Sequence, residues 1–213
     1  MKYSILALCL PFIAASCSLG NMGDTTPSNE LSGTYSTILT AAYQEELLAN
    51  TLYKEMLAKY PAEKEIANII ESEQNHMKSV GRLLEKYNLP IPTDFGTYSG
   101  AYTSLKNMIE RSITGAIEAG IIIETGDINH LVDEYKKIEL TDVRLVFENI
   151  GGGSFNHLRA FIRMAEAYNY TPSLDTKTFL TKEEMQSVGP LNQKMTELLL
   201  KNNLPVSGTQ AGS

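Results

Sequence analysis

The sequence predicts an all-α protein built around a four-helix bundle. Four stretches carry apolar residues at steps of three and four, short turns join them in two pairs, and no stretch has a convincing strand pattern. Each apolar stripe is interrupted by a residue type that binds metals. The stripes are Leu39, Ala42, Glu46, Ala49, Tyr53 and Met56; Ile66, Ile70, Glu73, His76, Met77, Val80 and Leu84; Ile113, Ile117, Gly120, Glu124, Asp127 and Leu131; and Val143, Val146, Ile150, Gly153, His157, Ala160 and Met164.

The first two helices are predicted from Gly33 to Tyr60 and from Pro61 to about Tyr87. Proline suits the first turn of a helix, so Pro61 marks the start of the second one. The segment from Asn88 to Pro92 ends that helix, because proline cannot continue it. The short turn predicts that the two helices pack antiparallel.

The second pair of helices follows a longer crossover connection. We expect a loop over residues 93–101, a short helix over 102–110, and a third main helix that Ser112 caps and that ends near Lys137. The fourth helix is predicted from Thr141 to about Asn169. Residues 170–213 form an extension with short helices near 182–187 and 191–200, and we expect its end to be partly disordered.

Residues 1–16 are predicted to be a lipoprotein signal peptide. Lys2 supplies the positive start, and the apolar run over 5–15 is too short to span a bilayer. The small residues before Cys17 resemble a lipobox, which implies cleavage before Cys17 and its acylation; an ordinary secretory signal is the alternative. Residues 17–33 then form a flexible tether. The expected location is the bacterial cell envelope, at the outer membrane or cell surface rather than the inner membrane.

The composition limits the partners of the protein. The 213 residues suffice for one domain with a real core, and the net charge of -7 with a pI near 5.1 argues against nucleic acid. Cys9 and Cys17 are the two cysteines, and Cys9 falls in the predicted signal peptide. The remaining domain therefore has no disulfide, and its stability must come from helix packing or from metal.

Glu73 and His76 form a Glu-x-x-His unit on the second helix. Residues three apart differ by about 60° around the helix axis, so both side chains can reach one ion. A carboxylate on a buried face is costly unless it is paired or binds a cation. Two-metal helical bundles take one Glu from each of two helices and Glu-x-x-His from the other two. Here the first and third helices supply Glu46 and Glu124.

Four short strings, in matching order within residues 36–168, resemble a known family. They are Glu45–Ala49, Glu71–Met77, Glu124–Ile128 and Gly153–Phe161. The chain resembles the ferritin-like superfamily, in the branch catalogued as domain of unknown function 2202. The resemblance implies a ferritin-like four-helix bundle over residues 34–169 with a carboxylate-bridged di-iron or di-manganese centre. Such centres serve iron oxidation, peroxide reduction or oxygen activation.

The fourth helix departs from this pattern. Ser154 stands three residues before His157, where a second Glu-x-x-His would have Glu. Glu148 cannot replace that residue, because it faces the opposite side of the helix. Asp127, one turn from Glu124, either binds metal directly or orients a histidine. The predicted centre holds two ions, or only one, and iron or manganese suits it, with zinc also compatible. Its residues are Glu46, Glu73, His76, Glu124, Asp127 and His157.

Several residues have simpler interpretations. Glu46 could share a solvated edge with Glu45, Glu124 could lie on the surface, and His157 could be a hydrogen-bonded core histidine. We expect His130 to be exposed and Tyr53 to serve core packing. Arg159 is a candidate partner of an acidic ligand. The three consecutive glycines at 151–153 either break the fourth helix, bulge it, or admit the close approach of another helix or a small substrate.

Two classes of function follow. The first is an envelope-anchored di-metal oxidoreductase that acts on peroxide, oxygen or ferrous iron. The second is a non-enzymatic lipoprotein that uses the bundle for metal binding or partner interaction. The expected partners are the membrane, through the lipid on Cys17, a small oxidant or metal ion, and a second copy in a homodimer. A serine hydrolase is poorly supported, because no Gly-x-Ser-x-Gly motif is present.

Overall fold

The computed structural model describes residues 33–187 and 190–207, and every regular element within them is a helix. The all-α prediction is therefore confirmed for this part of the chain. None of these described helices is both long and apolar enough to cross a membrane. The predicted signal peptide, Cys17 and the tether up to residue 32 lie outside the described residues, as does the end of the extension from residue 208.

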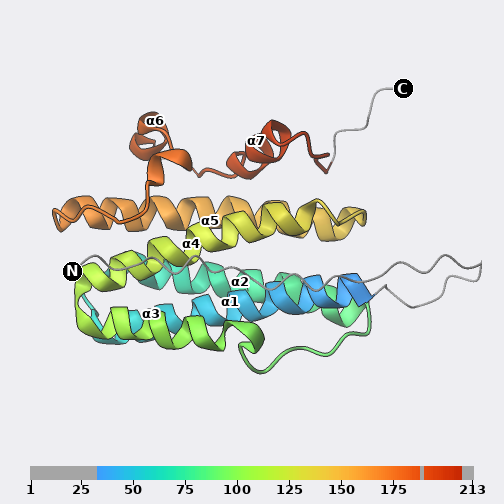
Figure 1. The fold of residues 1–213 in the computed structure, drawn as a ribbon, viewed down its shortest axis with the longest axis horizontal. Helices are drawn as coiled ribbons and strands as arrows, with labels where there is room; N and C mark the ends of the chain where they lie inside the picture. Colours follow the sequence, from blue (N-terminus) through green and yellow to red (C-terminus); the bar gives the residue numbers. More distant parts are fainter. Residues whose placement is uncertain (1–32, 188–189, 208–213) are drawn as a thin grey trace, which may run out of the picture.

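Four long helices form the body of the protein (Figure 1). Helix α1 (Gly33–Lys59) packs along α2 (Lys64–Lys86), and α4 (Ile113–Tyr135) packs along α5 (Thr141–Ala167). The two hairpins meet where α2 contacts α5 and α1 contacts α4. Helix α2 begins at Lys64 rather than at Pro61, because the chain first makes a turn over residues 61–62.

The crossover between the hairpins contains more helix than expected. The 3₁₀ helix η1 (Gly96–Tyr98) leads directly into α3 (Ser99–Arg111), which packs against α4 and α1. The predicted loop thus ends earlier than expected, because η1 already turns the chain with helical geometry into Ser99. Ser112 is the cap of α4 as predicted, since its Oγ accepts a 3.0 Å hydrogen bond from the backbone N–H of Gly115.

The inner faces of the four long helices make one continuous apolar core. The stripes read from the sequence bury most of their apolar members, whereas four stay half-buried: Met77, Ile113, Val146 and Ala160. Burying each large apolar side chain stabilises the fold by about 1.5–3 kcal/mol before entropy is counted. The largest fully buried side chains include Tyr53, Phe147, Phe155, Phe161, Leu39, Leu84 and Ile117.

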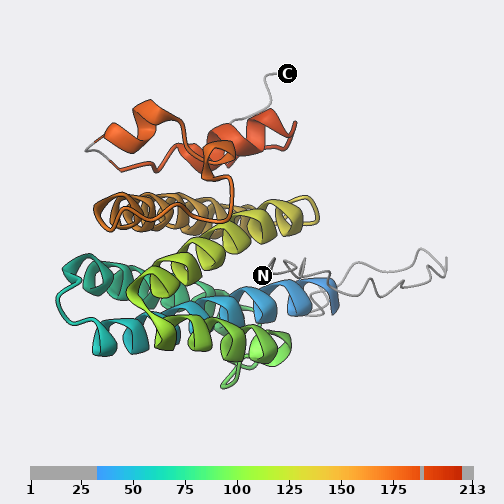
Figure 2. The same ribbon diagram turned by 60° about the vertical axis from the view of Figure 1, so that its left-hand side comes forward.

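The C-terminal extension forms a further layer over α5. It contains η2 (Thr176–Thr178), α6 (Lys182–Gln186) and α7 (Lys194–Lys201), and Figure 2 shows them on the side of α5 away from α1 and α2. Met195 and Leu199 of α7 are fully buried. The layer therefore covers the outer face of α5.

Helix α5 runs without interruption through its three consecutive glycines. The break and the bulge considered above are therefore wrong, and close approach is the reason for these residues. A Cβ atom on Gly151 would lie 2.7 Å from Met195 Sδ, and one on Gly153 would lie 2.5 Å from His76 Nε2. Real Cβ contacts are wider than this. Glycine at 151 lets α7 pack against α5, and glycine at 153 makes room for the imidazole of His76.

Two glycines of α4 give a direct test of this packing. Gly126 is exposed with open space around it, so Gly126→Ala should raise the free energy of unfolding by up to about 1 kcal/mol. A Cβ on Gly120 would collide with the ring of Phe161, so Gly120→Ala should lower it by about 1–3 kcal/mol. Urea denaturation of both variants measures these changes. Equal effects in the two variants would contradict the packing described here.

Candidate metal centre

The six residues predicted as ligands lie in the interior of the bundle. Helix α1 supplies Glu46, α2 supplies Glu73 and His76, α4 supplies Glu124 and Asp127, and α5 supplies His157. All six are buried, and Glu73 and Glu124 are only 2% and 1% exposed. Glu46 is therefore not on a solvated edge, and Glu124 is not on the surface.

Five of these side chains form two groups that share Glu73. The first group is Glu46, Glu73 and His76, and the second is Glu73, Glu124 and His157; within each group the ligand-type atoms lie within 4.8 Å of one another. His76 Nδ1 lies 3.1 Å from Glu73 Oε2, and His157 Nδ1 lies 2.8 Å from Glu73 Oε1. The two carboxylate oxygens of Glu73 therefore face two different imidazoles.

The remaining distances complete the two groups. His76 Nδ1 lies 3.2 Å from Glu46 Oε2, and His157 Nδ1 lies 3.5 Å from Glu124 Oε2. The centroids of the two imidazole rings are 5.5 Å apart. Each histidine thus has its Nδ1 between the shared carboxylate and a second carboxylate from another helix.

His157 Nδ1 is a buried atom that lies between two carboxylates but fails the geometric criteria for a hydrogen bond to either. It makes no hydrogen bond to any described residue, although Glu73 Oε1 is close to it. The distance is short enough, so the direction of the ring nitrogen must be what fails. A buried polar atom normally has a partner. An imidazole nitrogen between two carboxylates fits a metal ligand, and it fits equally a protonated core histidine paired with both carboxylates.

The charges of the centre perturb one another strongly. Burial alone would raise the pKa of Glu73, but His157 and His76 hold it well below its usual range. Burial alone would lower the pKa of His157, but Glu124 and Glu73 raise it to about 9. Burial raises the pKa of Glu46 and of Asp127 well above the usual range. Without a metal, protons therefore balance the charge, and bound cations would displace them.

Ser154 is joined to Asp127 instead of the shared centre. Its hydroxyl donates a hydrogen bond to Asp127 Oδ2, and both side chains are buried. Asp127 belongs to neither of the two groups, but it lines a cavity of about 10 Å³ together with Glu46, Glu73 and Glu124. That volume is about what one water molecule needs. The serine therefore orients a carboxylate from α4 beside the centre.

Two neighbours differ from the sequence-based interpretation. Tyr53 does more than fill the core, because its hydroxyl donates to Glu124 Oε1, and burial raises its pKa well above the usual value. The sequence did hold a sign of this role, because Tyr53 lies on the same helical stripe as Glu46. The expectation that His130 is exposed is wrong. It is half-buried, with Nδ1 2.5 Å from Glu45 Oε2, because η1 brings Tyr98 over it.

Other candidate residues lie outside the centre. Glu148 accepts hydrogen bonds from the hydroxyl of Tyr135 and from the backbone N–H of Ser207, so it points away as predicted. Arg159 donates to Ser187 Oγ at 2.6 Å and to Asn156 Oδ1 at 3.2 Å. The contact with Ser187 ties the C-terminal extension to α5.

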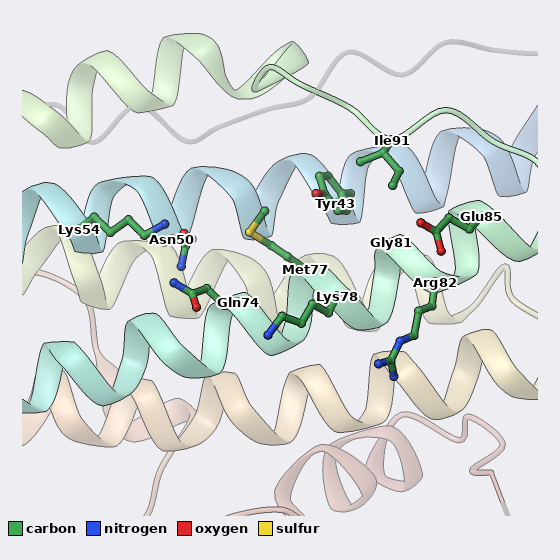
Figure 3. A pocket seen from close by; sticks show the side chains of 10 residues that line it. All are labelled: Tyr43, Asn50, Lys54, Gln74, Met77, Lys78, Gly81, Arg82, Glu85 and Ile91. Carbon is green, nitrogen blue, oxygen red and sulfur yellow. The ribbon is translucent and has the colours of Figure 1, made fainter.

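A wider surface hollow of about 500 Å³ lies on the outer side of α1 and α2 (Figure 3). Gln74 and Met77 of α2 line it, whereas Glu73 and His76 lie on the inner face of the same helix. The hollow is therefore separate from the buried centre. Its other lining residues are Tyr43, Asn50, Lys54, Lys78, Gly81, Arg82, Glu85 and Ile91.

Gly153→Ala should disturb this centre without adding or removing a ligand. The new Cβ would press on His76 Nε2 and push the imidazole away from Glu46 and Glu73. We expect the variant to bind fewer metal ions per chain than the wild type, measured by elemental analysis after anaerobic reconstitution. Gly126→Ala is the control, because its Cβ meets open space. Full metal content in Gly153→Ala would contradict the proposed place of His76.

Comparisons with known proteins identify the family. Residues 36–186 match the family described as Uncharacterized protein domain (DUF2202). The uncharacterized protein MJ0754 of Methanocaldococcus jannaschii is 37% identical over 155 residues, which cover 68% of this chain and 80% of that protein. The crystal structure of hypothetical protein MJ0754 superimposes with a TM-score of 0.64 at 33% identity and covers 76% of this chain and 95% of that one. The chain therefore belongs to the DUF2202 family.

Proposed function

We propose that the protein is a ferritin-like metal-binding protein of the cell envelope, with a centre for two iron or manganese ions that acts on peroxide, oxygen or ferrous iron. One observation carries this proposal: the two oxygens of Glu73 each face a different buried histidine. A carboxylate in that position would bridge two ions. The pairing of α1 with α2 and of α4 with α5 is consistent with the ferritin-like bundle.

The residues present fit such a pair of ions. Glu46, Glu73 and His76 would hold one ion, and Glu73, Glu124 and His157 the other. Carboxylate and imidazole donors suit iron and manganese, and they are also compatible with zinc. With Asp127 included, four buried carboxylates carry as many negative charges as two divalent ions carry positive ones. This balance favours two ions over one, despite the serine at position 154.

The chemistry of the centre would come from the metals, which exchange electrons with oxygen species. The contribution of the chain is to fix the ligands. Tyr53 donates a hydrogen bond to Glu124 and so orients it. Ser154 holds Asp127 in the same way. Tyr53 and Phe161, with ring centroids 5.3 Å apart, are fully buried and close the apolar core beside the centre.

The second candidate is a lipoprotein that binds metal without catalysis. Ser154 is the observation that favours it, because its hydroxyl replaces the carboxylate that the fourth helix of a complete centre would supply. Its hydrogen bond to Asp127 positions a carboxylate from a different helix, and that position need not suit the redox reaction.

The proposed location rests on the sequence before the described domain. The lipobox-like residues before Cys17 support acylation and attachment to the envelope, and residues 17–33 would tether the bundle to the membrane. We extend the proposal to homodimers, in which two copies would pack through their helix faces. Gel filtration of the purified chain tests this part of the proposal separately from the metal content.

Metal content tests the centre directly. The wild-type chain, reconstituted with Fe(II) or Mn(II) without oxygen and then desalted, should hold two ions per chain. The double variant Glu73→Gln/His76→Gln should hold none, because it removes the shared carboxylate and one imidazole. Glu71→Gln, an exposed change on the same helix, is the control and should keep both ions. Unchanged content in the double variant would disprove this assignment.

Exposure to air separates the two candidate functions. After anaerobic Fe(II) loading, air should produce a band in the near ultraviolet if a bridged ferric pair forms. This increase in near-ultraviolet absorption should be lost in Glu73→Gln/His76→Gln and kept in Glu71→Gln. Two bound ferrous ions that give no spectral change in air would favour the non-enzymatic lipoprotein.

A further inference from the structure

A small cavity of about 10 Å³ lies beside the metal centre between α1 and α4. Its lining is dominated by carboxylates, and Ala49 and Ile123 complete it. Helix α2 contributes only Glu73, the residue shared by the two ligand groups, to the lining of this cavity. The carboxylates are Glu45, Glu46, Glu73, Glu124 and Asp127.

The carboxylates that line this cavity differ in their exposure to solvent. The side chain of Glu45 is 13% exposed, whereas those of Glu46, Glu73 and Glu124 are 4%, 3% and 2% exposed. Glu45 is therefore the carboxylate of this cavity that solvent reaches most easily. Acidic groups along a passage with low-dielectric walls concentrate cations and speed their capture.

Contacts from two other elements hold Glu45 at the mouth of the cavity. Its Oε2 pairs with His130 Nδ1 at 2.5 Å, and the hydroxyl of Tyr98 lies 3.4 Å from the same nitrogen. His130 Nε2 lies 3.7 Å from Glu134 Oε1 one turn further along α4. Glu45 is not a member of either ligand group. A carboxylate fixed at the mouth without contributing to the groups is placed to receive ions and pass them inward.

Two other sides of the centre are partly covered, and the side chain of His76 is 11% exposed. Helix α2 separates the ligands from the outer hollow shown in Figure 3. On the α5 side, Met195 of α7 packs at Gly151, so the C-terminal layer covers the glycine segment. Among the described residues, the gap between α1 and α4 is where the carboxylates of the centre reach a cavity.

We propose that Glu45 is the entry carboxylate of the centre and that divalent cations pass from it along Asp127 to Glu46, Glu73 and Glu124. This inference rests on the proposed two-metal function and adds the route by which ions arrive. Glu45 acts on the rate of loading, whereas the two ligand groups set the final number of bound ions. Its role is therefore kinetic, which distinguishes it from a ligand.

Stopped-flow loading of the metal-free chain with Co(II), followed by visible absorption, tests the route. Glu45→Gln removes one negative charge at nearly the same size, and it should slow loading by about fivefold at low salt while the final number of ions stays the same. The difference from wild type should shrink as salt is added, because salt screens exposed charges. Glu45→Asp keeps the charge and should keep most of the rate.

Glu85→Gln is the matched control, because Glu85 is an exposed carboxylate that lines the outer hollow (Figure 3). It should load at the wild-type rate. Equal rates for Glu45→Gln and Glu85→Gln would overturn the route, and so would a loss of bound ions in Glu45→Gln, which would make Glu45 a ligand. Absence of metal uptake by the wild-type chain would instead overturn the proposed function, and the route with it. Circular dichroism of each variant verifies that the helices are retained.

Discussion

The burial of ionisable groups in the middle of the bundle is the constraint on which the rest of the structure depends. Glu46, Glu73, Glu124 and Asp127 share the core with His76 and His157. An uncompensated buried charge costs several kcal/mol, far more than one apolar contact returns. The fold can keep this cluster only if the imidazoles, protons or bound cations neutralise it. The two ligand groups that share Glu73 are arranged so that bound cations would neutralise these carboxylates.

Small residues and hydrogen bonds on the surrounding helices adapt the packing to this cluster. Gly153 leaves the space that the ring of His76 occupies, and Gly151 admits Met195 of the outer layer. The hydroxyls of Tyr53 and Ser154 reach Glu124 and Asp127 across helix interfaces. A core selected for stability alone would place apolar side chains at these positions. The arrangement therefore gives up apolar packing to hold polar side chains in fixed positions.

Much of the helical architecture was predictable, because periodic apolar stripes and proline positions depend on local sequence. The faces of Glu46, Glu73, His76, Glu124 and His157 followed from the same periodicity. What could not be predicted depends on contacts between distant segments. His130 is half-buried because η1 folds over α4, and Tyr53 reaches Glu124 across 71 positions of sequence. The uninterrupted path of α5 through its glycines likewise depends on α2 and α7, which no local pattern reveals.

A crystal structure of the chain soaked with Mn(II), with anomalous diffraction data, tests the central claim most directly. A two-ion centre should give two anomalous peaks per chain, one among Glu46, Glu73 and His76 and one among Glu73, Glu124 and His157. A single peak, or peaks only at exposed carboxylates while these six side chains remain as they are, would contradict it.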